Sequence, residues 1–339
     1  MEFNKSNRFD NENQKEENPN LIHHKGVIGE FDYDPNIWEI CEGDGLDKEY
    51  LHFKNIYVEN LELPKGLISC RCMFYDCVLP KDFTLSDKFN TFNIIDMKGM
   101  FKECKLPEHF KLGNNFDTSN VKIMQSMFHN CKLPKSFTLG DKFDTSNVKN
   151  MMSMFNSCKL PENFSLGDKF DTKNVDSMQF MFCNCKLPKT FSLGNRFDTF
   201  NVTNMRSMFC QCKLPENFTL GNKFDTSNVT NMWSMFCQCK FPKNFSLGEN
   251  FDTSNVSSMR SMFEECIISK NFSLGDKFNN RNVKDMSWMF SHCKLPENFS
   301  LGNKFDTVNV INMYAMFKDC QMSDSFKEKH KELIAKQFT

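Results

Sequence analysis

The sequence has few of the residues that define fibrous or low-complexity proteins: 14 Gly and 11 Pro in 339 residues. This scarcity excludes a collagen-like chain. The formal net charge at pH 7 is −1, so the basic footprint of a nucleic-acid-binding protein is also missing. No stretch approaches the roughly 18 apolar residues of a membrane helix, and residues 1–20 lack the apolar core of a signal peptide. The sequence alone therefore predicts a cytoplasmic protein that neither binds nucleic acid nor inserts into a membrane.

Catalytic motifs are missing as well. The chain has no P-loop, no G-x-S-x-G and no H-E-x-x-H, and its seven histidines are scattered. We expect no enzyme, no cofactor and no metal site. The alternative enzyme site would lie among the acidic residues near the N-terminus, which are Asp32, Asp34, Glu39, Glu42 and Asp44. Their spacing does not make them converge, so we interpret this segment as a cap on the core.

Phe, Met and Cys are abundant, with 38, 22 and 16 residues, and they recur in phase. A Met-Phe pair appears every 27 residues, and a cysteine follows each Phe by three residues. We number each repeat from the residue after this cysteine, so that the cysteine is position 27. Nine full units then occupy residues 78–320. A fixed period predicts stacked units that share one core, and we assign the Met and Phe columns to that core.

The spacing within one unit predicts its local structure. In residues 213–239, the apolar residues Val229, Met232, Met235, Phe236 and Cys239 follow the spacing of one helix face. We therefore expect a helix over positions 15–27, with the Asn column at position 16 bonding backbone groups at its start. The alternation in Asn217-Phe218-Thr219-Leu220 predicts a short strand. The predicted fold is an α/β repeat solenoid of about ten strand-turn-helix units, with a parallel sheet on one side and helices on the other.

The degraded ends of the repeat predict the domain organisation. Residues 1–20 are expected to be a disordered tail, and residues 21–50 an N-terminal cap. The repeat solenoid covers residues 51–320, with an atypical first rung at residues 51–77. Residues 321–339 are charged and helical in pattern, which predicts a C-terminal helical cap.

Two cysteine columns need separate interpretations. The ten cysteines at position 27 lie on the expected buried face, where we expect packed, reduced thiols. Their spacing also permits disulfides between rungs. Cys183, Cys210 and Cys237 add a second column at position 25. Residues two apart on a helix point in different directions, whereas zinc needs convergent ligands, so we expect no metal there.

Residues 224–239, FDTSNVTNMWSMFCQC, resemble the repeat signature of BspA-like leucine-rich-repeat surface proteins, which include the mycoplasma lipoprotein-associated repeats. The resemblance covers about residues 51–320. It implies a leucine-rich-repeat-like solenoid from a bacterial surface protein or a protist relative. It also implies surface or secreted localisation and binding of host proteins or matrix, and it brings no catalytic residues.

A repeat protein binds partners through positions that vary between units. Here positions 15, 18, 21, 22 and 25 vary most, and they lie on the outward face of the expected helix. Arg and aromatic residues are the usual anchors of interfaces. We therefore predict a protein-binding surface from Phe180, Phe200, Arg206, Trp233, Arg260 and Trp288. Its centre would lie around Phe200, Arg206, Trp233 and Arg260.

Several alternatives remain open from sequence. These aromatic residues could be exposed without any partner, in which case the chain would be a structural spacer. The repeated Ser or Thr at position 7 could instead bind a glycan or an extended peptide. A cytoplasmic chain would act as an intracellular scaffold or an immunity-type binder. We expect a monomer, or a weak end-to-end dimer through an exposed sheet edge.

Overall fold

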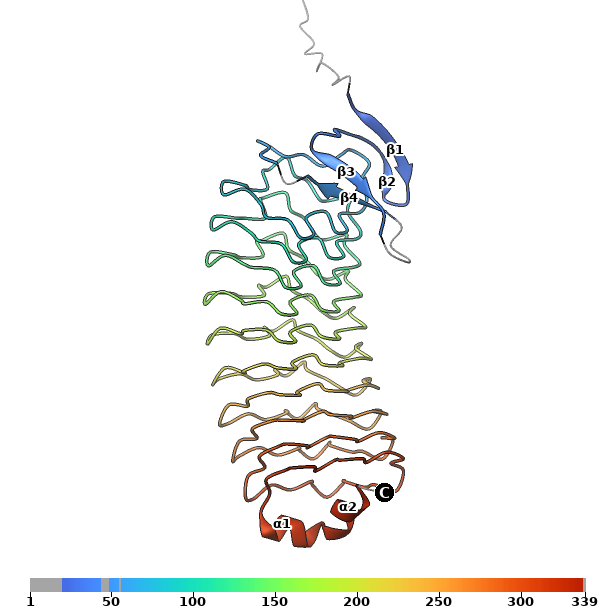
Figure 1. The fold of residues 1–339 in the computed structure, drawn as a ribbon, viewed down its shortest axis with the longest axis vertical. Helices are drawn as coiled ribbons and strands as arrows, with labels where there is room; N and C mark the ends of the chain where they lie inside the picture. The colour runs from blue at the N-terminus through green and yellow to red at the C-terminus, as the bar shows by residue number, and fades with distance from the viewer. Residues whose placement is uncertain (1–19, 44–48, 55, 338–339) are drawn as a thin grey trace, which may run out of the picture.

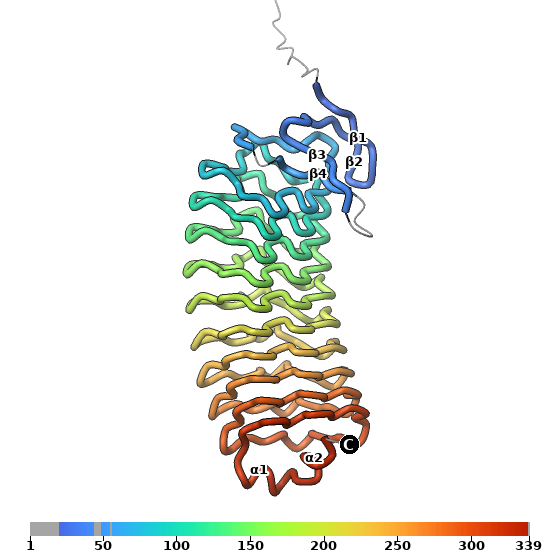
Figure 2. The backbone as a smooth tube through the Cα atoms, in the orientation of Figure 1, coloured from blue at the N-terminus to red at the C-terminus, as the bar shows by residue number. Residues whose placement is uncertain are grey.

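The computed structural model describes residues 20–43, 49–54 and 56–337. These residues form an elongated column of stacked rungs, with short strands at one end and two short helices at the other (Figure 1). The predicted disordered tail falls almost entirely outside the described residues. Along the column, successive rungs follow one another in register (Figure 2).

Two antiparallel strand pairs lie at the N-terminal end. The strands are β1 (Ile22–Gly26) with β2 (Gly29–Tyr33), and β3 (Trp38–Cys41) with β4 (Tyr50–Phe53). The buried Trp38 ring packs edge-on against Phe53, with 5.6 Å between ring centroids. Its centroid is 6.5 Å from that of Phe74 in the first rung. This region therefore covers the apolar end of the column.

Positions 20–27 of each rung form two tandem β-turns, so the expected helix is wrong. In one rung, the N–H of Met127 donates to the C=O of Met124 (3.2 Å), and Cys131 donates to Phe128 (3.0 Å). The third residue of each turn has a left-handed backbone conformation: φ is 57° at Ser126 in the first turn and 51° at Asn130 in the second. This is the type II arrangement. In two such turns, the residues at i, i+3, i+4 and i+7 point into the core. Residues on one face of a helix have the same spacing.

Four other N–H groups of this segment donate to the next rung rather than along the chain. The pairs are Met124 to Asn150, Ser126 to Met152, Phe128 to Met154 and Asn130 to Asn156, at 2.7–3.0 Å. Single parallel bridges also join neighbouring rungs at positions 1 and 19, for example Lys105 to Lys132 and Asp96 to Ile123. Stacking thus satisfies the buried backbone groups that a helix would have satisfied internally.

The expected strand of each unit is also missing. Phe218 donates its N–H to the C=O of Pro215 (3.0 Å), which makes a turn, and Gly221 follows with φ 81°. Within the described residues, the named strands are those of the N-terminal region, and the helices are α1 (Asp324–Lys329) and α2 (Lys331–Lys336). The predicted leucine-rich-repeat-like α/β solenoid of strand-turn-helix units is therefore wrong. The chain is a repeat protein whose rungs consist of turns.

The core consists of columns of identical side chains, as the repeat pattern predicted. Phe rings at position 24 stack nearly parallel, with centroid distances of 5.6 Å between Phe101 and Phe128 and 5.8 Å between Phe209 and Phe236. Phe218 at position 6 packs edge-on against Phe209, 5.7 Å away. The Met residues at positions 20 and 23 are fully buried beside them in all nine units except the last, where Met313 is half-buried. Such aromatic geometry adds about 0.5–1.5 kcal/mol per pair beyond the area buried.

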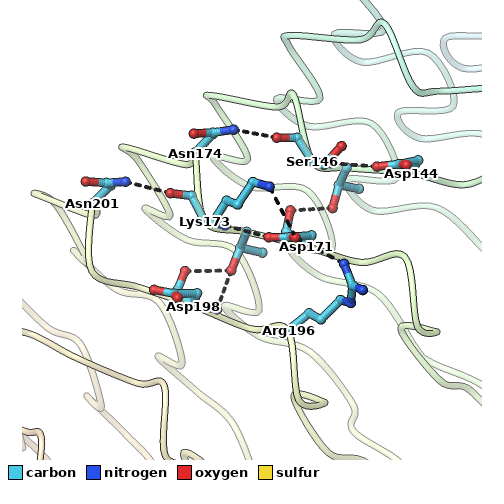
Figure 3. A network of polar contacts seen from close by, with 10 residues as sticks. Asp144, Ser146, Asp171, Lys173, Asn174, Arg196, Asp198 and Asn201 are labelled. Atoms are coloured by element: carbon cyan, nitrogen blue, oxygen red, sulfur yellow. Dashed lines mark hydrogen bonds and ion pairs between the residues drawn. The ribbon is translucent and has the colours of Figure 1, made fainter.

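Two polar columns tie the rungs together on the other side of the core. The buried hydroxyl of Thr145 donates to the C=O of Asp171 in the next rung (2.8 Å). At position 16, Asn174 donates to the C=O of Ser146 in the preceding rung (2.6 Å), as Figure 3 shows. The predicted role of the Asn column in bonding backbone groups is confirmed. The column is exposed, however, and it starts no helix.

At the C-terminal end, Gln337 takes the place of a further rung by accepting hydrogen bonds from the last one. The N–H of Ala315 donates to the backbone oxygen of Gln337 (3.0 Å), and that of Phe317 donates to its side-chain Oε1 (2.6 Å). These are the groups that would otherwise donate to positions 21 and 23 of a following rung. Ser323 starts α1 by accepting the N–H of Phe326, whose ring is buried. The two helices thus cover the last rung.

Candidate partner-binding surface

Positions 21 and 22 are the middle residues of the first tandem turn. Buried Met residues flank them on both sides, so their own side chains face outward. A side chain at position 19 stabilises the turn in the two central rungs: Asn204 Oδ1 accepts the N–H of Arg206 (3.0 Å), and Asn231 Oδ1 accepts that of Trp233 (2.9 Å). Stacking then places the same positions of neighbouring rungs side by side. Variable side chains at positions 21 and 22 therefore form one row along the column.

Four of the six predicted site residues meet in this row. The guanidinium carbon of Arg206 lies 3.8 Å from the ring centroid of Trp233 and 5.4 Å from that of Phe180. The guanidinium carbon of Arg260 lies 5.2 Å from the Trp233 centroid on the other side. We call Phe180, Arg206, Trp233 and Arg260 the arginine–aromatic row. Cations and rings alternate in it over four consecutive rungs.

The centre of the row is partly dehydrated. Arg206 and Trp233 are half-buried, and the Nε atom of Arg206 is buried without a hydrogen-bond partner among the described residues. A cation–π contact is worth about 0.5–1 kcal/mol when exposed and about 2 kcal/mol when desolvated. The two rings hold the planar guanidinium in one orientation, which a flexible exposed arginine would lack.

Phe180 occupies a costly backbone conformation. Its φ is 58°, in the left-handed region that bulky residues avoid. Most other rungs have Ser at this position, and Gly99 and Ala315 fill it in two more. Such a residue costs of order 1–3 kcal/mol. Trp288 is the one other bulky residue at this position in the nine units, with φ 62°. The strain at Phe180 puts an aromatic ring beside Arg206 where most rungs have a small side chain.

The other two predicted site residues lie apart from the row. Phe200 is at position 15, with its side chain 55% exposed, and no ring or cation contact joins it to the row within the described part of the chain. Trp288 packs edge-on against Tyr314, 5.5 Å away, and Lys318 Nζ lies 5.4 Å from its centroid. The predicted single patch is therefore two clusters and one isolated ring. Tyr314 and Lys318 were not among the predicted site residues, although both occupy variable positions of the last rung.

Free thiols lie next to this surface and beneath it. All sixteen cysteines, which belong to the described part of the chain, are free. The thiols at position 27 are buried, except for the half-buried Cys320. They donate inward, as Cys212 does to the C=O of Phe182 (2.9 Å). Burial raises the pKa of Cys158 and of Cys212 to about 12 each. The position 25 column of Cys183, Cys210 and Cys237 is half-exposed instead.

The acidic residues near the N-terminus form local contacts and no shared site. Asp32 bonds His23 Nδ1 (2.8 Å), and Asp34 accepts the N–H of Asn36 (2.9 Å). Asp44 lies outside the described residues. Over residues 20–43, 49–54 and 56–337, no cluster of three His, Cys, Asp or Glu side chains is arranged to hold a metal ion. Nor does that part of the chain contain a helix long and apolar enough to span a membrane.

The sequence matches one protein family model three times. The family is described as "Mycoplasma protein of unknown function, DUF285", and the matches cover residues 68–190, 138–218 and 189–299. Together these overlapping matches span more than half of the chain, which agrees with an internal repeat. The match is to this family and not to BspA-like proteins specifically. No curated protein and no solved structure matches the chain.

Proposed function

We propose a function for this chain, which belongs to the DUF285 family of Mycoplasma proteins of unknown function: it binds a protein partner through the arginine–aromatic row and catalyses no reaction. The observation that carries the proposal is the alternation of rings and guanidinium groups over four neighbouring rungs. Trp and Arg are the side chains most enriched at the energetic centres of interfaces.

The row is ordered before any partner arrives. Rings on both sides of Arg206 fix its guanidinium plane, so little side-chain entropy remains to be lost on binding. A planar guanidinium with its faces covered presents its edge, whose N–H donors fit a carboxylate. We therefore propose a partner segment that carries Asp or Glu beside an apolar side chain.

The finer resemblance to BspA-like surface proteins suggests the source of the partner. Under that resemblance the partner is a host or matrix protein and the chain acts in adhesion at the cell surface. An intracellular scaffold would use the same row for a partner from its own cell. Fractionation of cells, followed by protease treatment of intact cells, separates the two because protease reaches only a surface protein.

The test compares two double variants of the full chain. Arg206→Ala with Trp233→Ala should weaken binding of a partner protein by about thirtyfold or more, because interface centres contribute at least about 2 kcal/mol. The matched control is Arg196→Ala with Phe92→Ala, which removes an exposed arginine and an exposed phenylalanine away from the row. Its affinity, measured by biolayer interferometry, should stay within about threefold of the unmodified chain.

A spacer without a ligand site would give a different result. Both double variants would then behave alike in every binding assay, and no captured protein would distinguish them. If partner binding is lost only in the double variant Ser165→Ala with Ser192→Ala, the binding site is the position 7 column. That result would favour the glycan or extended-peptide alternative and contradict the row.

A further inference from the structure

The thiol column at position 25 is distinct from the arginine–aromatic row and from the column of buried thiols at position 27. Cys183, Cys210 and Cys237 occupy this position on three consecutive rungs. The residue after Cys183, Asn184, donates its N–H to the C=O of Cys210 (2.7 Å), and Gln211 donates to Cys237 in the same way (2.7 Å). The three backbones are thus held side by side in register.

Cys210 is the middle residue of the column, one rung from Cys183 and one rung from Cys237. Backbones joined as these are lie about 4.8 Å apart, within the range of about 4.4–6.8 Å between Cα atoms over which disulfides form. Cys183 and Cys237 are two rungs apart, so a direct bridge between them is outside this range.

We propose that Cys183 and Cys210 form a peroxide-sensitive site, in which Cys183 is the reacting thiol and Cys210 closes a disulfide with it. Half-exposed thiols beside a second thiol have the arrangement of redox-sensing cysteines. The substrate class is a small hydroperoxide, of which hydrogen peroxide is the simplest. This site goes beyond the proposed partner binding and does not depend on it.

The electrostatics of the pair assign the two roles. The hydrogen bond from Cys210 lowers the pKa of Cys183, against the opposing effect of burial. The same contact, together with that to Cys237 and with burial, raises the pKa of Cys210. Only the thiolate is the nucleophile, so Cys183 reacts first and Cys210 keeps its proton until the second step.

The reaction balances with peroxide as the oxidant. The Cys183 thiolate attacks one peroxide oxygen, the O–O bond breaks, and hydroxide leaves; Cys183 becomes a sulfenic acid. The Cys210 sulfur then attacks the Cys183 sulfur, the S–O bond breaks, and the hydroxyl leaves with the Cys210 proton as water. Hydroxide takes up the proton that Cys183 released on ionisation. Overall, two thiols and one peroxide give one disulfide and two waters.

The neighbouring position 27 thiols supply an internal control. Cys185 and Cys212 lie two residues further along the chain in the same rungs, but they are buried. Burial raises the pKa of both thiols, to about 12 for Cys212. Each C-x-C segment therefore pairs one available thiol with one protected thiol, and the two can be compared within one molecule.

The experiment uses the full, reduced chain and hydrogen peroxide. Before oxidation, Cys183 should react with iodoacetamide about tenfold or more faster than Cys212, as one unit of pKa difference alone would give. After oxidation, the intact mass should fall by two hydrogen atoms, and peptide mapping should link the Cys183 peptide to the Cys210 peptide. Thioredoxin should restore both thiols.

Two serine variants separate the roles, and serine is tolerated at position 25 because Ser291 occupies it naturally. Cys210→Ser should abolish the disulfide and leave Cys183 as a sulfenic acid that a cyclic 1,3-dione traps. Cys183→Ser should shift bridging to Cys210 with Cys237. The proposal is overturned if native Cys183 reacts no faster than Cys212, or if Cys210→Ser still forms a bridge to Cys183.

Discussion

Glycine at position 9 sets the direction of the chain in each rung after the first full unit. These glycines have φ values of 77–83°, and a Cβ built at Gly221 would meet no heavy atom within 4 Å. The requirement at Gly221 is therefore conformational and not one of space. A left-handed conformation costs an L-residue roughly 1–2 kcal/mol, which explains why this position does not vary as its neighbours do.

Gly221→Ala should lower the free energy of unfolding by about 1–2 kcal/mol, because alanine must adopt the same positive φ. Urea denaturation followed by fluorescence measures the change. Asn222→Ala, in the same turn and at ordinary φ, is the matched control and should change stability by less than about 0.5 kcal/mol. Equal losses in the two variants would contradict a conformational role for the glycine.

The buried thiols should make the protein sensitive to alkali. Burial raises the pKa of Cys212 to about 12, from its ordinary value of 9.0. A raised folded-state pKa gives stability that is complete below the unfolded pKa and is lost as pH rises toward the folded pKa. Between about pH 9 and 12 the unfolded chain therefore ionises at this residue while the folded chain does not.

Ionisation of Cys212 in the unfolded chain lowers the free energy of unfolding by about 1.4 kcal/mol per pH unit over this window, because one proton is released on unfolding. Cys212→Ala should remove this contribution to the slope. The slope comes from urea midpoints at several pH values from 8 to 10.5. The variant should be less stable than the unmodified chain at pH 7, since it leaves a small cavity. An unchanged slope would show that this thiol ionises normally in the folded state.

At the scale of the structural element, the rung depends on bonds to its neighbours. The hydroxyl of Thr226 is fully buried and donates to the C=O of Asp252 in the next rung (2.7 Å). The same bond recurs along the column, and Asn280 supplies it where threonine is missing by donating to the C=O of Asp306. A buried carbonyl left without a donor costs about 1–3 kcal/mol.

Thr226→Val keeps the side-chain shape and should reduce the free energy of unfolding by about 1–3 kcal/mol, the cost of that unsatisfied carbonyl. Thr219→Val is the control, because Thr219 is exposed and its hydroxyl contributes no bond between rungs. Thermal and urea unfolding measure both variants. A loss with Thr219→Val as large as with Thr226→Val would indicate a β-branched packing effect and not a hydrogen bond.

The rung also shows what the sequence could predict. The 27-residue period and the buried Met and Phe columns were visible because identical side chains recur in phase. The helix was wrong because Met232, Met235, Phe236 and Cys239 have inward spacing that tandem turns and a helix share. The positive φ at Ser234 and Gln238 distinguishes the turns from a helix, and neither Ser nor Gln predicts a positive φ from sequence.

The same error explains the outcome at the candidate site. A helix would have put positions 15, 18, 21, 22 and 25 on one outward face. Tandem turns instead put positions 21 and 22 in one row, so Arg206 meets Trp233 while Phe200 at position 15 lies elsewhere. The sequence therefore identified the variable residues but could not decide which of them touch.

At the scale of the whole molecule, each rung contacts chiefly the rungs before and after it. Stability in such a stack is close to a sum of rung and interface contributions. Deleting residues 105–131 joins Cys104 to Lys132 in the correct phase, so the column should still fold, with a lower unfolding free energy. The arginine–aromatic row lies outside this segment and should keep its geometry.

Deleting residues 213–239 also preserves the phase, but it removes Trp233 and brings Arg206 next to Arg260. The two guanidinium groups then lie on neighbouring rungs with no ring between them, which destroys the row. The column has the same length as in the first deletion. Both chains should give the same far-UV circular dichroism spectrum, with little helical signal, because both contain the same kind of turn-built rung.

The most direct measurement is therefore the partner affinity of these two deletions beside the full chain. We expect the deletion of residues 105–131 to bind the partner within about threefold of the full chain. The deletion of residues 213–239 should lose about thirtyfold or more of the affinity. Equal affinity of the two deletions would contradict the assignment of partner binding to the arginine–aromatic row.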